Sequence, residues 1–312
     1  PIGAAQIPLG VAGPLHILGQ HARGDFYIPL ATTEGALVRS YERGIVTLTR
    51  AGGVETCIYA DENRIAPVFT FEAIGEAHQF AQTLENHFEQ IRSEAESTTK
   101  HGKLLRLECY PTGREVAVNF CFSTGDAQGM NMIMKAADRA CQWIVAHTGA
   151  KTYYIFSGLN SEKRASGFLL PGGKGKKVIA GAHIPAKIVR LYLHTTPRAL
   201  RDIWQHTILG HTQAGALGYN AHFANGLAAL FIACGQDVAN IANASVGIAN
   251  FEETETGDLY ASVSLPSLTV ATVGGGTGLG TAHECLNMLQ CAGSGHAPKF
   301  AEIVAATLLA GE

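Results

Sequence analysis

The first candidates for chemistry are an aspartate, Asp237, and a lysine, Lys163, that stand far apart in the sequence. Asp237 comes shortly after the apolar stretch Leu227 to Cys234, and a carboxylate beside such a stretch is costly unless a cation or hydrogen-bond donors meet it. Spacing alone favours a helix cap, because Gly-Gln-Asp is good N-cap chemistry. Alternatively, Lys163 could be the cation, and a lysine aimed at a carbonyl stabilises the oxyanion that develops there.

Glu34 is a second carboxylate that has two interpretations. It stands in ATTEGALVRSYERG, residues 31–44, where Thr32 or Thr33 can cap a helix. Glu34 would then lie in the first turn of that helix, where the helix dipole favours a carboxylate. Taken alone, this spacing favours a capping role over a catalytic one. In the same way, Lys163 could belong to a solvated surface pair.

Two glycine-containing stretches could let a ligand approach the backbone closely. GDAQGMNM, residues 125–132, stands between an expected strand and an expected helix, where the dipole and free N–H groups favour an anion. It is not a G-x-G-x-x-G fingerprint, and a plain strand–helix turn is the alternative interpretation. The second stretch, GGGT at 274–277, could close over a ligand or form only a tight turn.

These residues must be positioned by a large core. The middle of residues 218–243 is apolar on every side, which predicts a central helix that is buried all round. Residues 1–30 read as extended and turning chain, and residues 60–68 as a polar loop. The remaining patterns predict a strand at 178–183, helices at 185–193 and 199–213, strands within 247–273, and helices at 279–290 and from residue 298.

The stretch from about residue 66 to residue 156 differs in its pattern of apolar and polar residues from the sequence on either side. Its periodicity predicts a helix at 73–92, strands at 103–110 and 115–122, a helix at 129–147 and a strand at 152–156. We therefore expect a small α+β domain, residues 66–156, inserted into a larger domain made of residues 1–65 and 157–312.

Length and composition limit the class of protein. The 312 residues are 46% hydrophobic and 16% charged, which is typical of a soluble globular protein of one or two domains. A net charge of −3 argues against a general nucleic-acid binder. The seven cysteines are odd in number and form no C-x-x-C pair, so we expect reduced thiols in a cytoplasmic protein.

Other features of the chain concern membranes, metals and its ends. No apolar run approaches a membrane span and no signal peptide opens the chain, so any membrane anchor would lie before residue 1. No metal-ligand spacing, P-loop or nucleophile elbow stands in the sequence, and no metal site is expected. The chain lacks an initial methionine and stops inside an apolar helical pattern, so both ends are expected to be cut. The residues alone indicate a two-domain α+β enzyme that takes an anionic, phosphorylated ligand at an acidic–lysine site.

Six stretches taken together resemble the 3-hydroxy-3-methylglutaryl-coenzyme A (HMG-CoA) reductase family, in a form closer to that of eukaryotes and archaea than to the degradative bacterial form. They are IPLGVAGPL (7–15), ATTEGALVRSYERG (31–44), GDAQGMNM (125–132), YNAHFAN (219–225), IACGQD (232–237) and TVGGGT (272–277). The resemblance implies reduction of HMG-CoA to mevalonate and free CoA by two successive hydride transfers from NADPH. It also implies a large helical and sheet substrate domain around the central buried helix, with an inserted small, ferredoxin-like α+β nucleotide-binding domain.

The resemblance assigns roles to the three charged residues. Lys163 would stabilise the oxyanions of the reaction, Asp237 would orient that lysine, and Glu34 would supply a proton, which requires its partial burial. The substrate-side positions of the family fall on Arg64, which would meet the CoA phosphates, and on Ser157, Glu162, Arg164, His222 and Asn225. The nicotinamide-nucleotide positions fall on Arg43, Asp126, Ala127, Gln128, Gly129, Met130, Asn131, Gly275, Gly276 and Thr277. Thr99 and Lys100 align with the pair that holds the 2′-phosphate of NADPH.

The sequence departs from the family pattern at several points. The usual T-D-K-K is Ser161 to Arg164 here, in a loop one residue shorter, and a substrate-side lysine aligns with His206 or with nothing. The histidine that protonates the departing CoA thiolate is expected beyond Glu312. These departures leave an alternative function open, that of a divergent relative that binds CoA esters without reducing them. A thioesterase or lyase would need a nucleophile or metal that the sequence lacks. Because the family's site is formed between two subunits, we expect a homodimer or a dimer of dimers.

Overall fold

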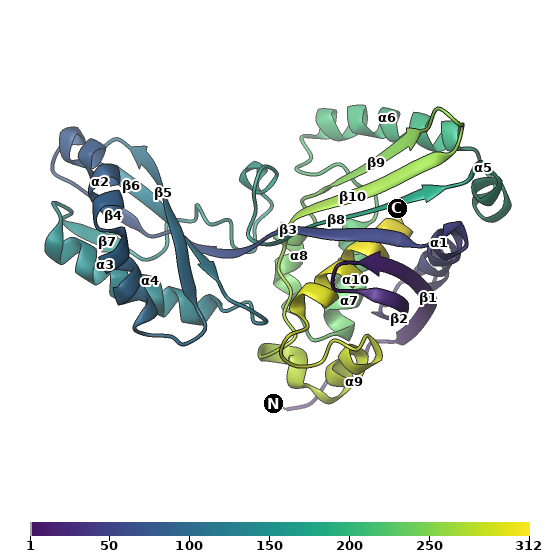
Figure 1. The fold of residues 1–312 in the computed structure, drawn as a ribbon, viewed down its shortest axis with the longest axis horizontal. Coiled ribbons are helices and arrows are strands. Elements are labelled where there is room, and N and C mark those ends of the chain that lie inside the picture. The colour runs from purple at the N-terminus through teal and green to yellow at the C-terminus, as the bar shows by residue number, and fades with distance from the viewer. Residues whose placement is uncertain (1) are drawn as a thin grey trace. The chain divides into compact units, whose positions relative to one another are not determined.

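The computed structural model describes residues 2–312, which form two compact units (Figure 1). The large unit comprises the chain up to residue 60 and residues 163–312, and the small unit comprises residues 61–162. Each unit combines helices with mainly antiparallel strands. The predicted α+β class is therefore confirmed.

The sheet of the large unit contains two groups of strands. In the first, β1 (Leu9–Gly19) pairs antiparallel with β2 (Arg23–Ala31) and, through residues 17–19, parallel with the start of β3 (Val54–Ile65). In the second, β10 (Leu259–Leu268) lies between β8 (Gly175–Ile184) and β9 (Ile248–Glu253) and is antiparallel to both. The hairpin of β1 and β2 was predicted only as extended and turning chain, because its glycines and prolines conceal the alternation.

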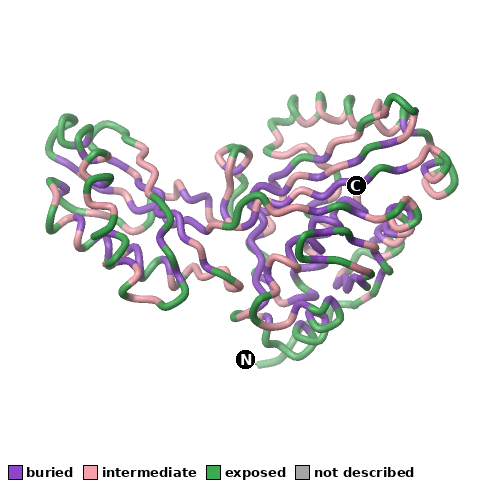
Figure 2. The backbone as a smooth tube through the Cα atoms, viewed as in Figure 1, coloured by how far each residue is buried: buried purple, intermediate pink, exposed green. Residues whose placement is uncertain are grey.

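Two buried helices, α7 (Phe223–Ala233) and α10 (Ala297–Gly311), form the centre of the large unit together with α1 (Leu37–Ala51) (Figures 1 and 2). The prediction of a central buried helix is confirmed, although α7 is shorter than the stretch 218–243. Ile232 departs from the expectation of burial all round, since 38% of its surface is exposed. Residues 300–310 of α10 are buried without interruption, so α10 is the more enclosed of the two helices.

Shorter helices complete the large unit. The expected helix at 185–193 is α5 (Ala186–Ile188) followed by a π-helical turn at Val189–Leu193. Helix α6 (Pro197–Ala214) begins at the cap residue Thr196, whose hydroxyl accepts from the Ala199 N–H at 3.2 Å, and it packs against β9. After α7 the chain forms a 3₁₀ turn at Val238–Asn240, α8 (Ile241–Ala244), a second 3₁₀ turn at Gly275–Gly278 and α9 (Gly280–Met288). Among residues 2–312, no helix is both long and apolar enough to span a membrane.

The small unit has an antiparallel sheet made of β4 to β7 and the last residues of β3, with helices that pack on it. Its elements are β4 (Val68–Thr70), α2 (Ile74–Asn86), α3 (Phe88–Glu96), β5 (Lys103–Thr112), β6 (Glu115–Ser123), α4 (Met130–His147) and β7 (Thr152–Tyr154). The strands stand in the order β7-β4-β6-β5. The helix predicted at 73–92 is interrupted at His87, whose φ of −111° and ψ of 14° end α2. Phe69, Phe80, Phe120 and Ile133 belong to the core of this unit.

The polar loop predicted at 60–68 is wrong over most of its length, because β3 continues to Ile65. Residues 63–65 pair antiparallel with residues 120–122 of β6, so their backbone groups are hydrogen-bonded in a sheet. The polar composition suggested a loop. In the structure Glu62 and Arg64 lie on the same face of a strand, and their charged groups are on that face. Arg64 therefore comes from a strand rather than from a loop.

Candidate active site

Asp237 uses its two carboxylate oxygens for two different purposes. Its Oδ1 accepts a hydrogen bond from the Ala239 backbone N–H at 3.1 Å and so caps the 3₁₀ turn that follows α7. Its Oδ2 lies 2.7 Å from Nζ of Lys163. The cap and the lysine partner, which spacing presents as alternatives, are both present. The two side chains are 39% and 44% exposed, so the pair is accessible to a ligand.

Gln236, which sequence reasoning did not select as a site residue, fixes the segment that carries Asp237. Its buried amide donates to the carbonyls of Cys234 and Ala271 at 2.8 and 2.9 Å and accepts from the Ala271 N–H at 2.8 Å. These bonds connect the end of α7 to the irregular segment between β10 and the GGGT run. A polar residue next to a buried helix end is the sequence signal that could have indicated this role.

The GGGT run lies against the same segment. A Cβ at Gly276 would collide with the backbone of Gly235, two residues before Asp237. The run forms a 3₁₀ turn in which the Thr277 hydroxyl donates to the Gly274 carbonyl at 2.7 Å. The predicted cofactor residues Gly275, Gly276 and Thr277 are thus brought beside the lysine–aspartate pair.

Lys163 itself has an uncommon backbone conformation. Its φ of 55° lies in the left-handed region, and so does the φ of 53° at Ser161, two residues earlier in the same loop. For a residue other than glycine this conformation costs on the order of 1–3 kcal/mol, and it persists only where the surrounding structure holds it. The backbone at Lys163 is therefore strained in the conformation that brings its side chain to Asp237.

Glu34 differs from its predicted setting in two ways. It precedes α1, whose N-cap is Ala36, and it is not in the first turn of that helix as the capping interpretation required. It is also exposed, so the partial burial expected for a proton donor is wrong for this chain alone. The reason is a turn in which the Glu34 N–H donates to the Thr32 hydroxyl at 3.0 Å and the helix starts three residues later. One carboxylate oxygen, Oε2, accepts from the Asn225 amide at 3.1 Å.

His222 and Asn225 stand at the start of α7, at the opposite end of this helix from Asp237. His222 is the N-cap residue, and its ring Nδ1 lies 3.4 Å from the hydroxyl of Tyr41 in α1. The predicted catalytic and substrate residues of the large unit therefore form two groups. One contains Glu34 and Asn225, the other Lys163 and Asp237, and α7, about 16 Å long, runs between them.

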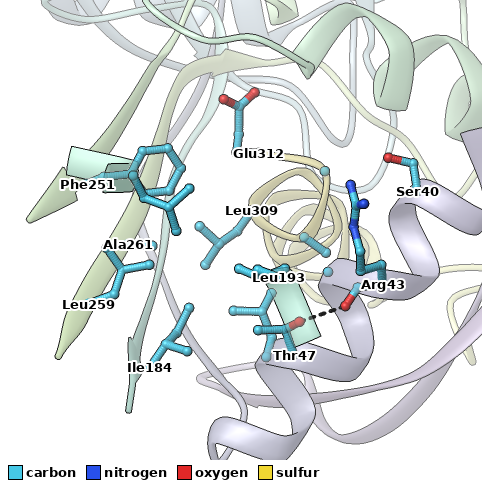
Figure 3. A pocket seen from close by; sticks show the side chains of 15 residues that line it. Ser40, Arg43, Thr47, Ile184, Leu193, Phe251, Leu259, Ala261, Leu309 and Glu312 are labelled. Atoms are coloured by element: carbon cyan, nitrogen blue, oxygen red, sulfur yellow. Dashed lines mark hydrogen bonds between the residues drawn. The ribbon is translucent and has the colours of Figure 1, made fainter. Parts of the chain in front are cut away.

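Arg43 lies in α1 on a pocket of the large unit (Figure 3). The pocket is bounded by α1, the end of α10 and strands β8 to β10, and its lining is mostly apolar. Arg43 and Glu312 contribute charge to its lining. His206 lies in α6, which contributes Leu200 to this pocket, but His206 itself does not line it.

In the small unit, the predicted nucleotide residues gather at the N-terminal end of α4. Gly129 is the N-cap of α4 at a φ of 69°, and Asn63 Nδ2 donates to the Gln128 carbonyl at 2.5 Å. The Thr99 hydroxyl accepts from two backbone N–H groups of the turn that includes Lys100. A Cβ at Gly102 in that turn would lie 3.3 Å from the methyl carbon of Met132. The two loops selected from the sequence are therefore neighbours.

Arg64 lies in a cluster of charges on β3 and β5. Its Nη2 is 2.5 Å from Glu62 Oε1 and its Nη1 is 3.6 Å from Glu108 Oε2, while Arg106 binds both carboxylates. Only 8% of the Arg64 side chain is exposed. Burial by itself would raise the pKa of Glu62, but hydrogen bonds from Arg106 and Arg64 hold that pKa below its usual range.

The other substrate-side residues have varied settings. The Ser157 hydroxyl donates to the Ala66 carbonyl at 2.7 Å, Glu162 is half-buried and Arg164 is exposed. Among residues 2–312, no cluster of three or more histidine, cysteine or acidic side chains is suited to a metal ion.

The fold and the site define an α+β protein of two units with a lysine–aspartate pair suited to stabilising an oxyanion. The chain belongs to the hydroxymethylglutaryl-coenzyme A reductase family, whose model matches residues 1–312. This confirms the resemblance and the prediction of an oxidoreductase. The chain is 43% identical over 314 residues to the 3-hydroxy-3-methylglutaryl-coenzyme A reductase of Methanothermobacter thermautotrophicus, covering 100% of this chain and 79% of the relative.

Solved structures show the same fold at lower identity. The 3-hydroxy-3-methylglutaryl-coenzyme A reductase of Streptococcus pneumoniae superposes with a TM-score of 0.80 at 17% identity, over 99% of this chain and 84% of that one. A structure of that class II enzyme bound to NADPH gives a TM-score of 0.79, also at 17% identity, over the same shares of the two chains. The higher identity to the archaeal relative agrees with the predicted form of the family.

Proposed function

We propose that this protein reduces HMG-CoA to mevalonate and free CoA, in two steps that each consume one NADPH and one proton. The observation that carries the proposal is the 2.7 Å pair of Lys163 and Asp237 in a chain of this reductase family. NADPH supplies the hydride in each step. The residues of the chain then have to bind the thioester, stabilise negative charge on its oxygen and deliver protons.

Lys163 is the group suited to the developing charge. Its ammonium donates hydrogen bonds to the oxygen of the thioester as the first hydride adds to the carbon. The carbon–sulfur bond then breaks, and CoA leaves as a thiolate that takes up the first proton. The same ammonium next donates to the oxygen of the resulting aldehyde as the second hydride adds. Asp237 orients the ammonium group through their ion pair, and the hydrogen bond from the Ala239 N–H in turn fixes Asp237. Glu34 holds the proton for the alcohol oxygen, with Asn225 orienting its carboxyl group.

We infer that the small unit binds NADPH and has the ferredoxin-like fold. Support for the fold comes from its element order, strand-helix-strand-strand-helix-strand when α2 and α3 are taken together, and from the strand order β7-β4-β6-β5. Support for the ligand comes from the N-terminus of α4, where free N–H groups and the dipole favour a phosphate. We infer that Lys100 holds the 2′-phosphate of the bound NADPH. We propose that the CoA ester is bound by Arg64, Ser157, Glu162, Arg164 and His222. We propose that the nicotinamide nucleotide is bound by Arg43, Asp126 to Asn131 and Gly275 to Thr277.

We further infer a cytoplasmic homodimer or dimer of dimers with shared active sites. An exposed apolar groove in the large unit is lined by Ile7, Leu9, Ile232 and Leu279, among other residues, and such a surface is suited to a second subunit. The seven free cysteines suit a reducing compartment. Sedimentation of the full-length protein as a monomer would contradict the shared site.

The test of the proposed reaction is absorbance at 340 nm with NADPH and HMG-CoA, on the full-length protein. Loss of two NADPH per mevalonate supports the proposal. The altered lysine segment, Ser161 to Arg164, leaves one competing function, binding of CoA esters without reduction. Tight CoA-ester binding without loss of absorbance would support that second function and overturn the first.

A further inference from the structure

The start of α7 is bound by a carboxylate from the far end of the chain. Glu312, the residue after α10, accepts hydrogen bonds through Oε1 from the His222 N–H at 2.6 Å and from the Ala221 N–H at 3.1 Å. Its Oε2 accepts from the same Ala221 N–H at 3.0 Å. A carboxylate in this place is favourable because the N-terminus of a helix presents free N–H groups and a positive dipole end.

A second residue, Tyr41 of α1, also binds the start of α7 at His222. The Tyr41 hydroxyl donates to the His222 carbonyl at 3.2 Å, and its ring centroid lies 5.5 Å from that of His222. Tyr41 is fully buried, and a Cβ at either Gly226 or Gly311 would collide with its phenol group. Glycine at these two positions therefore lets α7 and α10 close around Tyr41.

The charges around His222 suit these hydrogen bonds. Burial raises the pKa of Tyr41, and the negative charges of Glu312 and Glu34 raise it further, so the phenol keeps its proton and remains a donor. Burial also raises the pKa of Glu312, against the effect of the two N–H groups that it accepts from. His222 thus has its N–H and its carbonyl held by two different helices.

We propose that Glu312 and Tyr41 are positioning residues, which fix the start of α7 so that His222 stays in place and Asn225 stays hydrogen-bonded to Glu34. The connection to the site is the 3.1 Å hydrogen bond from Asn225, in the first turn of α7, to the Glu34 carboxylate. This inference rests on the proposed function, because it takes His222, Asn225 and Glu34 as residues that meet the substrate. Small displacements of such residues are costly, since a misplacement of about 1 Å can reduce a rate on the order of 100-fold.

The experiment compares variants of the full-length protein in NADPH oxidation and in HMG-CoA binding by calorimetry. Glu312→Ala should lower kcat/KM for HMG-CoA by about 10- to 100-fold and raise the Kd for HMG-CoA, at an equal concentration of folded protein. Glu312→Gln keeps one acceptor oxygen and should recover part of that loss. Tyr41→Phe should lower kcat/KM without removing packing volume.

A matched control comes from the same helix. Glu302 is fully buried in α10 and accepts from the backbone N–H groups of Gln20, His21 and Ala22 at 2.7 to 3.1 Å. It makes the same kind of bond as Glu312, but to the turn between β1 and β2. Glu302→Ala, or Glu302→Gln where the alanine variant does not fold, should lower Tm and leave kcat/KM and Kd unchanged.

The outcomes separate this inference from the proposed reaction. If Glu312→Ala lowers Tm like the Glu302 variant but leaves kcat/KM and Kd unchanged, the positioning role is wrong. If the wild-type protein binds HMG-CoA without oxidising NADPH, the proposed reaction is wrong, and the Kd of Glu312→Ala still decides the positioning role. A wild-type protein that does neither overturns both.

Discussion

Lys163 Nζ lies 2.7 Å from Asp237 Oδ2, while Oδ1 of the same carboxylate caps the turn at Ala239. The aspartate is therefore fixed by a backbone bond that does not depend on the lysine. A half-exposed ion pair contributes little to stability, on the order of 1 kcal/mol or less. The main effect of this pair is thus to direct the ammonium group, which is what oxyanion stabilisation requires.

Lys163→Ala should lower kcat by at least about 100-fold, because the donor to the developing oxyanion is lost. Binding of HMG-CoA, measured by calorimetry, should remain within a few-fold of wild type. Lys187→Ala, which removes an exposed lysine of α5, is the control and should leave kcat unchanged. Near-normal turnover of Lys163→Ala would remove this residue from the proposed role.

Lys100→Ala should raise the KM for NADPH far more than the KM for NADH, because only NADPH carries the 2′-phosphate that this lysine is proposed to hold. The measurement is the ratio of the two KM values in wild type and variant. Lys135→Ala removes another exposed lysine of the small unit, from α4, and should leave the ratio unchanged. An equal rise for both nucleotides would indicate that the 2′-phosphate binds elsewhere.

Gln236→Ala should lower both stability and turnover. The variant loses three hydrogen bonds to Cys234 and Ala271 and leaves buried backbone groups without a partner, which costs about 1–3 kcal/mol for such a group. Since Asp237 follows directly, kcat should also fall in the folded fraction. Chemical denaturation gives the first quantity and steady-state kinetics the second. A stability loss with unchanged kcat would mean that Gln236 supports the fold but not the site.

Acid should destabilise the small unit through Glu62. The folded pKa of Glu62 is lowered, so its contribution is complete above the unfolded glutamate pKa of about 4.3 and is lost as pH falls through the lower folded value. Thermal melts between about pH 3 and pH 6 should therefore show a steeper loss of Tm for wild type than for Glu62→Gln. Parallel pH profiles for the two proteins would contradict the assignment.

Much of the architecture follows from local patterns in the sequence. The all-round apolar stretch 227–234 predicts a buried helix, and α7 is that helix. The periodicities between residues 66 and 156 predict most elements of the small unit in the right order, but not the short strand β4 or the break between α2 and α3. The motif residues predict the family directly, since six stretches spread over the chain have to match together.

Other features were decided only by the tertiary structure. The polar composition of residues 60–65 suggested a loop. A strand whose charged side chains pair with those of a neighbouring strand has the same polar composition as a loop, so the sequence does not distinguish the two. The capping interpretation of Glu34 failed for a similar reason, since a turn at Thr32 delays the start of α1.

The site depends on partners that local spacing cannot identify. The sequence by itself determined that Asp237 needs a donor or a cation and that Lys163 could be one. Only the folded chain decided that Asp237 has both kinds of partner and that Glu312 holds His222. The physical reason is that caps and helix periods act over a few residues, whereas ion pairs join residues that come together only when the core forms.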